Sequence, residues 1–396
     1  MRLPLLPIIL LVLFNLLIDG YILLVLRHSF RKKWVVRSFA ASIIFFIIYA
    51  VVMVALPRRS GSDRVLIVDM WMLYAYFSVY LPKYLFCIFS LIGQIPRLWR
   101  GRRWKLLDPA GFAAAFVLFC IMWWSAVVNR LGYRINEVDL YFDNLPEQFD
   151  GYRMVQFSDF HTGTYVNDTT YVHKIVELIN QQNADAILFT GDIVNRHTGE
   201  LLPFVNTLSA LKAPDGVHSV LGNHDYGDYC EWPSAEAKRD NRLLMDSLQA
   251  SMGWNLLNNR TVFLHEGSDS IALIGVENWG DPPFTTYGNL DKAYPTQSDS
   301  TFKILLTHNP AHWTHAIADN DAVNIALSLS GHTHAMQCQV GSWSPAKYRY
   351  STWGGLYFDK SKKHQLYVNI GLGTVALPAR IGATPEITVF TLHKTR

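Results

Sequence analysis

Residues 153–161 read RMVQFSDFH. The first part of this stretch alternates polar and apolar side chains as a short β-strand does, and Asp159 and His161 follow directly after it. A carboxylate or an imidazole directly after a buried strand is held in a fixed position, because the sheet fixes the strand that precedes it. The stretch therefore predicts a core strand and, at the C-terminal end of that strand, the first part of a ligand-binding site.

Four further apolar runs end in the same way. Residues 186–190, 217–221, 302–307 and 325–330 are followed, in this order, by Gly191-Asp192, Gly222-Asn223-His224-Asp225, His308 and Gly331-His332-Thr333-His334. Residues 171–182 carry apolar side chains at helical spacing, and residues 200–211 and 241–252 have the pattern of further amphipathic helices. Strands that alternate with helices predict an α/β sheet, with the polar clusters gathered at its C-terminal edge.

The types of side chain in these clusters favour a pair of divalent cations. Asp, Asn and His supply oxygen and nitrogen ligands, and no Cys stands among the clustered positions. Manganese, iron or zinc therefore fits better than a structural zinc held by thiolates. If one carboxylate bridges the two ions, the centre keeps a residual positive charge, which attracts an anionic phosphate ester.

The order D-x-H, GD-x-x-N, GNHD, a single His and GHTH resembles the calcineurin-like metallophosphoesterase superfamily, in its membrane-associated bacterial branch, over roughly residues 150–392. The resemblance implies an α/β/β/α sandwich and hydrolysis by a hydroxide that bridges two metals. One metal would be held by Asp159, His161, Asp192 and His334, and the other by Asp192, Asn223, His308 and His332. His224 would stabilise or protonate the leaving oxygen.

Two positions differ from the pattern of many relatives. Asn195 stands where they carry an Asp that orients the catalytic His, so either Asn195 or Asp225 is the candidate for this task. Ala335-Met336-Gln337 follows the last motif, where close relatives often read Gly-Gly-Gln. Arg196 is a candidate for binding the substrate phosphate, and the alternative is an ordinary solvated loop arginine.

Roughly the first 130 residues are apolar in long blocks that basic runs interrupt. Four blocks approach the roughly 20 residues that cross a bilayer, namely residues 3–26, 38–56, 65–92 and 111–128. We therefore predict a transmembrane helical domain over residues 1–129, a linker over 130–151 and a metallophosphoesterase domain over 152–396. Asn15 and Asp19 in the first block mark either a functional site or polar packing between helices.

Charge indicates the orientation in the membrane. The first and third connections between the blocks are the most basic; they contain Arg27, Arg31, Lys32, Lys33 and Arg37, and Arg97, Arg100, Arg102, Arg103 and Lys105. Both connections are predicted to be cytoplasmic, which places the catalytic domain on the extracytoplasmic side of a bacterial inner membrane. Residues 1–144 hold 17 Lys and Arg against 7 Asp and Glu, and the rest holds 18 against 25, so the basic excess belongs to the membrane part and gives no support for nucleic-acid binding.

These features favour a metal-dependent phosphoesterase acting on lipid-linked or cell-envelope substrates. A protein or small-molecule phosphomonoesterase is one alternative. A membrane signalling or scaffold protein with an inert phosphoesterase-like domain is another, although such domains usually lack ligands and none is missing here. Cys230 and Cys338 each follow a ligand cluster, and they either pair across the rim of the site or remain free thiols.

Overall fold

The computed structural model describes residues 5–29, 32–57, 60–280, 285–294 and 300–395. The chain forms two compact units, one built mainly from residues 1–127 and the other mainly from residues 128–396. The helical unit contains α1 (Leu5–Ser29), α2 (Lys33–Ala55), α3 (Asp63–Ile92) and α4 (Leu107–Val127). All four helices are long and apolar enough to cross a membrane, which confirms the four predicted spans.

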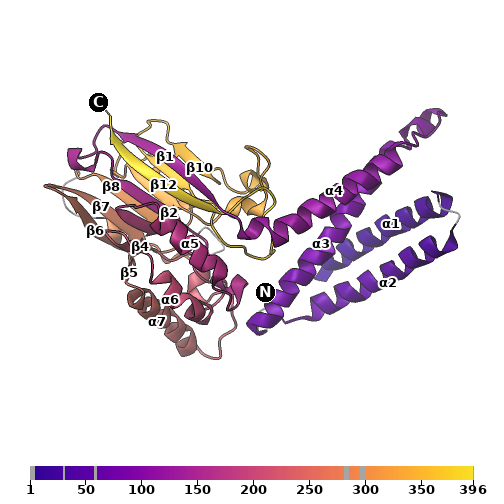
Figure 1. Cartoon of the computed structure of the whole chain (residues 1–396), viewed down its shortest axis with the longest axis horizontal. Helices are drawn as coiled ribbons and strands as arrows, with labels where there is room; N and C mark the ends of the chain where they lie inside the picture. The colour runs from indigo at the N-terminus through magenta and orange to yellow at the C-terminus, as the bar shows by residue number, and fades with distance from the viewer. Residues whose placement is uncertain (1–4, 30–31, 58–59, 281–284, 295–299, 396) are drawn as a thin grey trace. The chain divides into compact units, whose positions relative to one another are not determined.

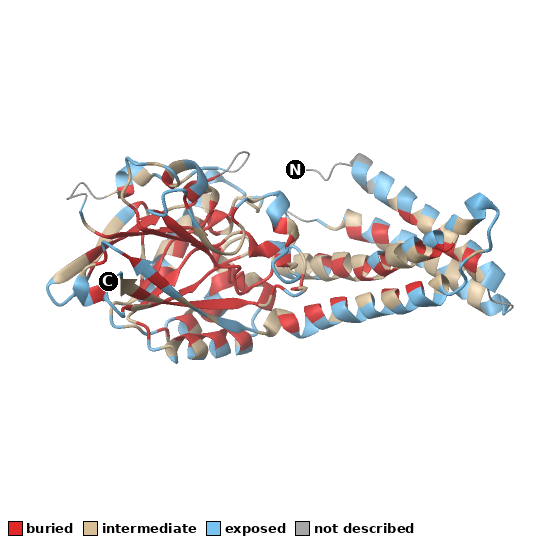
Figure 2. Ribbon diagram, turned by 90° about the horizontal axis from the view of Figure 1, so that it is seen from above, coloured by how far each residue is buried: buried red, intermediate tan, exposed pale blue. Residues whose placement is uncertain are grey.

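Large apolar side chains cover the outside of the helical unit. Leu17 is 72% exposed, Val51 65% and Phe112 68%. In Figure 2 the four helices are mostly pale blue and tan, whereas the strands of the other unit are mostly red. Apolar surface on this scale is unfavourable in water and favourable in lipid, so this exposure agrees with membrane insertion.

Polar side chains pack inside the helical unit. The Asn15 amide donates to the Tyr76 hydroxyl at 2.5 Å. Lys83 Nζ lies 2.7 Å from Asp19 Oδ1, and α3 continues as one helix through Pro82. Side chains that pair with one another in this way join helices inside a bilayer, so the structure favours the packing interpretation of Asn15 and Asp19.

The second unit contains two six-stranded sheets. The first sheet has the strand order β1-β12-β2-β3-β4-β5, with bounds Arg134–Phe142, Glu386–Lys394, Arg153–Phe157, Ala186–Phe189, Val217–Ser219 and Trp254–Leu256. The second has the order β10-β11-β9-β8-β7-β6, with bounds Gly355–Phe358, Gln365–Val368, Leu327–Ser330, Lys303–Thr307, Asp269–Val276 and Arg260–Glu266. The five predicted ligand-bearing strands are β2, β3, β4, β8 and β9.

The two sheets pack face to face around a buried apolar core that includes Met154, Leu188, Leu306 and Phe390. The alternate side chains of β2 face the other way and pack against α5 (Thr170–Asn180), on the side of the first sheet where α6 (Val205–Leu208) and α7 (Ala235–Ser251) also lie (Figure 1). On the second sheet, α8 (Leu290–Ala293) and a helical turn at Trp313–Ile317 cover the outer face. The unit is therefore the predicted α/β/β/α sandwich.

One predicted helix differs from the observed structure. Residues 200–211 form a 3₁₀ segment at Thr198–Phe204, followed by the single turn of α6. Pro203 lies inside the 3₁₀ segment and has no N–H to donate, which prevents a continuous α-helix there. The other two predicted helices, 171–182 and 241–252, correspond to α5 and the C-terminal part of α7.

The segment predicted as a linker, residues 130–151, contains the edge strand of the first sheet. This strand, β1, pairs in parallel with β12 from Arg134↔Glu386 to Phe142↔Lys394. β12 in turn is antiparallel to β2. As a result, β1 begins at the edge of the sheet where β2 ends, and this is the edge that carries the ligand clusters.

Candidate metal centre

The loops that follow the strands hold their polar residues in an unusual backbone conformation. Asp159, His161, Asp192, His332 and His334 all have positive φ, between 49° and 75°. Non-glycine residues adopt this left-handed region at an energetic cost, and such strain gathers at functional sites. Backbone hydrogen bonds tie the first two loops together, because Asp159 N donates to Gly191 O at 2.8 Å and His161 N donates to Asp192 O at 3.2 Å.

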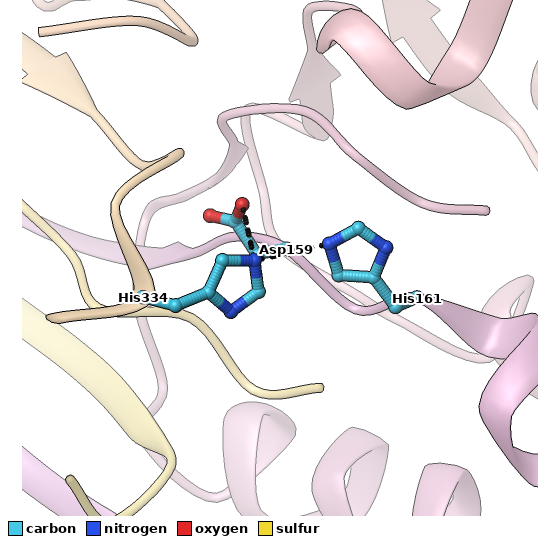
Figure 3. Close-up of side chains that lie close together, drawn as sticks. All are labelled: Asp159, His161 and His334. Carbon is cyan, nitrogen blue, oxygen red and sulfur yellow. Dashed lines mark hydrogen bonds and ion pairs between the residues drawn. The ribbon is translucent and has the colours of Figure 1, made fainter. Parts of the chain in front are cut away.

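Asp159, His161 and His334 form the first cluster, and all three are buried (Figure 3). His334 Nε2 lies 3.2 Å from Asp159 Oδ1 and 3.0 Å from His161 Nε2. Two imidazole nitrogens approach this closely only when a proton or a cation lies between them. The ligand atoms lie within 4.8 Å of one another, so one metal ion could contact all three.

Asp192, His308 and His332 form the second cluster, again with ligand atoms within 4.8 Å of one another. His308 Nε2 is the centre of this cluster. It lies 3.1 Å from Asp192 Oδ2, 3.2 Å from His332 Nδ1 and 3.1 Å from Asn223 Oδ1. Its other nitrogen, Nδ1, donates to Thr190 O at 2.8 Å, which directs Nε2 toward the cluster.

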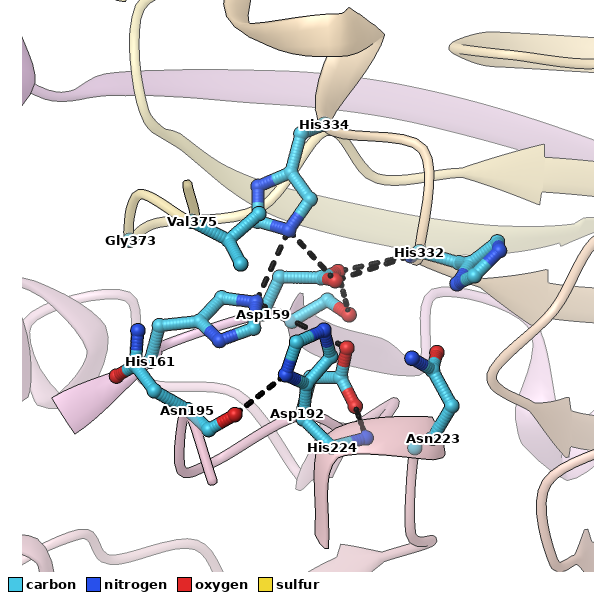
Figure 4. Close-up of polar contacts among 12 residues, drawn as sticks. Asp159, His161, Asp192, Asn195, Asn223, His224, His332, His334, Gly373 and Val375 are labelled. Carbon is cyan, nitrogen blue, oxygen red and sulfur yellow. Dashed lines mark hydrogen bonds and ion pairs between the residues drawn. The ribbon is translucent and has the colours of Figure 1, made fainter. Parts of the chain in front are cut away.

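Asp192 joins the two clusters. Its Oδ2 atom, which contacts His308, also lies 3.8 Å from His161 Nε2 in the first cluster. Its Oδ1 atom accepts a hydrogen bond from His224 N at 2.8 Å. Figure 4 shows Asp192 with His161 and His334 on one side and Asn223 on the other. The donor set therefore fits two cations with a shared carboxylate.

The protonation states in the two clusters are strongly shifted. Burial opposes ionisation of Asp192, but the neighbouring His308 and His224 hold the pKa of Asp192 well below its usual range. Burial also opposes protonation of His308, yet the adjacent Asp192 raises the pKa of His308 to about 9. Burial and the neighbouring His308 lower the pKa of His332 to about 3. A proton on His308 thus occupies the position that a cation would take.

Metal binding should therefore release protons. The raised pKa of His308 means that its proton stabilises the metal-free fold below about pH 6.5 and that this stabilisation is lost as pH rises through about 9. At pH 7 a metal must displace this proton, so we expect release of at least one proton, with a further proton when a bound water becomes hydroxide. The His308 proton alone makes the metal affinity increase by up to about tenfold per pH unit between these limits. Calorimetric titration with zinc in buffers of different ionisation enthalpy measures the release. A proton count near zero would contradict this assignment of charge.

A backbone carbonyl, not a side chain, orients the ring of His224. His224 Nδ1 donates to Asn195 O at 2.5 Å, and the ring stacks on Tyr229 at a centroid distance of 4.3 Å. The Asn195 amide instead donates to Thr164 Oγ1 at 3.2 Å. Since the carbonyl fixes the proton on Nδ1, Nε2 is the nitrogen that remains for proton transfer.

Asp225 holds the loops rather than the ring. Its carboxylate accepts four backbone N–H groups, from Asp192 (2.9 Å), Ile193 (2.9 Å), Val194 (3.2 Å) and Gly222 (2.9 Å). Burial and the nearby Asp192 charge raise the pKa of Asp225 to about 7 despite these donors. These hydrogen bonds position the backbone at Asp192. Asp225 is therefore connected to His224 indirectly, through Asp192, which accepts the His224 N–H.

Arg196 lies in the loop after β3, and its side chain is 15% exposed. Arg196 Nε lies 3.9 Å from Glu200 Oε1, and Glu200 also accepts the backbone N–H of Asn195 at 2.5 Å. The contact with Glu200 orders this loop. Phosphate binding by Arg196 stays a prediction.

The sequence patterns did not identify three residues that contact the ligands. The Tyr350 hydroxyl lies 3.2 Å from His332 Nε2, and Tyr229 OH accepts from Asn223 Nδ2 at 2.8 Å. Arg380, fully buried, donates through Nη2 to His334 Nδ1 at 3.1 Å. None of the three directly follows a strand-like run, which was the signal that identified the ligands.

The four cysteines are free in the structure. Cys230 and Cys338, the two that follow ligand clusters, are both partly buried. The structure therefore favours free thiols over the alternative of a disulfide across the rim.

The residues after the last motif are strained. Ala335, Met336 and Gln337 have φ of 50°, 46° and 54°, where a side chain costs about 1–2 kcal/mol per residue. Met336 is 46% exposed, so its replacement loses little packing. We expect Met336→Gly to raise the free energy of unfolding by about 0.5–1 kcal/mol, after allowing for the flexibility of glycine. Thermal unfolding in detergent measures this, with Met336→Ala as control; a glycine variant less stable than the alanine variant would contradict it.

Comparison with known protein families agrees with this geometry. Residues 152–336 match the family described as calcineurin-like phosphoesterase. Residues 1–130 match a second family, described as the transmembrane domain of a probable calcineurin-like phosphoesterase. Fold, site and matches define a multi-pass membrane protein with a metal-dependent phosphoric ester hydrolase domain.

Two bacterial proteins support the same classification. The chain is 34% identical over 262 residues to the uncharacterized metallophosphoesterase YkuE of Bacillus subtilis, covering 63% of this chain and 82% of that protein. It is 30% identical over 255 residues to an uncharacterized metallophosphoesterase of Helicobacter pylori, covering 64% of this chain and 62% of that protein. The crystal structure of phosphopantetheinyl hydrolase (PptH) from Mycobacterium tuberculosis is similar with a TM-score of 0.34 and 11% identity, over 56% of this chain and 89% of that one. The chain belongs to the calcineurin-like metallophosphoesterase family.

Proposed function

We propose that this chain hydrolyses phosphoesters with two divalent cations held by Asp159, His161, Asp192, Asn223, His308, His332 and His334. The observation that carries the proposal is the position of Asp192, whose Oδ2 atom lies within 3.8 Å of both His161 and His308. The presence of all seven ligands argues against an inert, scaffold-only domain. Their oxygen and nitrogen donors suit manganese, iron or zinc.

The protein side chains have separate tasks in this reaction. When bound, the two cations supply a hydroxide nucleophile at neutral pH and neutralise charge that develops on the phosphate. Asp192 is oriented by the N–H of His224, so the bridging carboxylate and the acid are fixed to each other. His224, with Nδ1–H held by the Asn195 carbonyl, can give the Nε2 proton of its imidazolium form to the leaving oxygen, which leaves the neutral ring with its proton on Nδ1.

We further propose that the substrate is a lipid-linked or cell-envelope phosphoester on the extracytoplasmic side of a bacterial inner membrane. Four candidate spans place the domain on a membrane. The basic first and third connections favour a cytoplasmic position for those loops, and therefore the opposite side for the domain that follows the fourth span.

The test is a panel of phosphoesters assayed on detergent-purified full-length protein with defined manganese, iron or zinc. The panel includes lipid pyrophosphates, phospholipid diesters and soluble mono- and diesters. We expect metal-dependent turnover, with lipid-linked esters preferred over soluble ones. Turnover of soluble monoesters alone would replace the lipid proposal by a phosphomonoesterase, and no metal-dependent turnover of any ester would overturn the proposed activity.

A further inference from the structure

The segment that follows the last ligand motif exposes large apolar side chains beside the metal centre. We call residues 338–350 the rim segment. Within it, Val340 is 67% exposed, Trp343 39% and Tyr348 77%. The segment is attached to the ligands directly, because the hydroxyl of Tyr350, at its end, lies 3.2 Å from His332 Nε2.

The rim segment is held rigidly, so this exposure is built into the fold. Val340 and Trp343 exchange backbone hydrogen bonds at 2.8 and 3.0 Å across a two-residue turn. Ser344 Oγ donates to Ala335 O at 2.6 Å, and it also accepts from Ala346 N at the start of the short helical turn Pro345–Tyr348. The apolar side chains therefore project from a fixed support.

The charge of the rim segment is opposite to that of the unit around it. Residues 338–350 contain Lys347 and Arg349 and no Asp or Glu, whereas residues 145–396 as a whole hold 18 Lys and Arg against 25 Asp and Glu. Lys347 Nζ lies 5.2 Å from the centre of the Tyr348 ring. Aromatic side chains mixed with basic ones are typical of protein surfaces at the membrane–water interface, where the rings lie at headgroup depth and the cations meet lipid phosphates.

Hydrogen bonds connect the rim segment to the point where the chain leaves the fourth predicted span. Gln339 N donates to Ile381 O at 2.8 Å, and Cys338 forms a β-bridge with Ile381. The preceding residue, Arg380, accepts a hydrogen bond at its carbonyl from Asn129 Nδ2 at 2.6 Å. Asn129 follows the last residue of α4, Val127, by only two positions.

Sheet topology gives the same location independently. β1 starts at Arg134 at the ligand edge of the first sheet, since it is parallel to β12 and β12 is antiparallel to β2. Val127 and Arg134 are seven residues apart in the chain, so the segment between them can span at most about 25 Å. The ligand edge is therefore the edge at which the chain enters the unit from the membrane.

We propose that the rim segment is a membrane-docking surface: Val340, Trp343 and Tyr348 enter the headgroup region of the leaflet from which α4 emerges, and Lys347 and Arg349 contact anionic phospholipid there. Docking holds the ligand edge at the bilayer surface, where a phosphoester in a lipid headgroup is presented to it. The docking itself is independent of catalysis, whereas its role in substrate access rests on the proposed function.

Spin labels on the full-length protein in lipid nanodiscs containing phosphatidylglycerol test the docking. The four native cysteines are replaced by Ser, and single cysteines are introduced as Val340→Cys, Tyr348→Cys and, as control, Phe358→Cys. Phe358 is 51% exposed and pairs with Gln365, at the end of the second sheet opposite the ligand motif. Labels at 340 and 348 should show an oxygen-to-nickel collision ratio at least roughly threefold higher than the label at 358.

Equal ratios at all three positions would overturn the proposal. A second pattern would also overturn the proposal: labels at 340 and 348 with low accessibility to both oxygen and nickel and with spin–spin broadening. That pattern indicates contact with a second copy of the chain. Nanodiscs of phosphatidylcholine alone should give a smaller ratio at 348 than the anionic discs. An unchanged ratio at 348 would show that Lys347 and Arg349 do not bind anionic phospholipid, which would contradict that part of the proposal.

An activity measurement distinguishes docking from the proposed function. The triple substitution Val340→Ser, Trp343→Ser and Tyr348→Ser should lower turnover of a lipid phosphoester in bilayers by roughly tenfold or more, because three apolar contacts with the membrane are lost. It should leave hydrolysis of a soluble aryl phosphoester within about twofold, as should Phe358→Ser. Equal loss on both substrates would contradict docking. A wild-type protein that hydrolyses neither ester defeats the proposed function while the label result stands.

Discussion

Asp192→Asn should abolish phosphoester hydrolysis, with a loss of roughly 10³-fold or more in turnover. The substitution keeps the size and shape of the side chain, and the amide oxygen can still accept the N–H of His224, which is 2.8 Å from Asp192 Oδ1. It removes the negative charge that lies 3.1 Å from His308 and 3.8 Å from His161. Since the Oδ2 atom of this carboxylate lies close to imidazole nitrogens of both clusters, both metals should be lost or weakened together.

The measurement combines turnover with metal content per protein molecule. Asp246→Asn is the matched control, because Asp246 is a partly exposed carboxylate on α7 that pairs with Arg242. It should keep wild-type activity and metal content. The Asp192 variant also loses the charge that pairs with the buried His308, so its thermal unfolding is measured beside its turnover to separate misfolding from loss of metal. Wild-type turnover by the Asp192 variant would contradict the shared-carboxylate assignment.

His224→Ala should give the second largest effect, a loss of roughly 10²–10⁴-fold in turnover with little change in metal content. The size should depend on the leaving group. Esters with poor leaving groups need a proton at the departing oxygen, whereas an aryl ester with an acidic phenol departs with little help. The variant should therefore lose far more activity on an alkyl ester than on a nitrophenyl ester.

That dependence separates proton transfer from a structural role. The ring of His224 packs on Tyr229 and lies edge-on to His161 at 4.8 Å, so a merely structural loss would lower turnover of both esters alike. His265→Ala, which removes an exposed histidine in β6, is the control and should change neither rate. An equal loss on the two esters would contradict the assignment of His224 as the acid.

The sequence predicted the strands well, and the polar side chains that follow them gather in two clusters, because both signals are local. That these clusters bind metal stays a proposal. Each ligand follows directly after an apolar run, and a run that ends a buried strand carries its successor to the sheet edge. Asp159 after β2 and His308 after β8 are examples, and the structure brings them to one centre. The four membrane helices could also be predicted from local sequence, because length and apolar composition define them.

The features that the sequence did not predict depend on contacts between distant residues or on backbone atoms. The Asn195 carbonyl that orients His224 cannot be recognised from a side-chain pattern, and Arg380 meets His334 only through the folded chain. β1 pairs with β12, some 250 residues later in the chain. The partner is not visible in the local sequence, so residues 130–151 were predicted to be a linker. The missing helix at residues 200–211 was the exception, because Pro203 was visible there as a local signal.

Anomalous diffraction from crystals of the full-length protein loaded with manganese or zinc tests the two-cation centre. We expect two anomalous peaks roughly 3.5–4 Å apart. Asp192 should lie between them, with Asp159, His161 and His334 around one and Asn223, His308 and His332 around the other. Peaks elsewhere, a single peak at full metal loading, or no peak at all in protein that remains folded would contradict it.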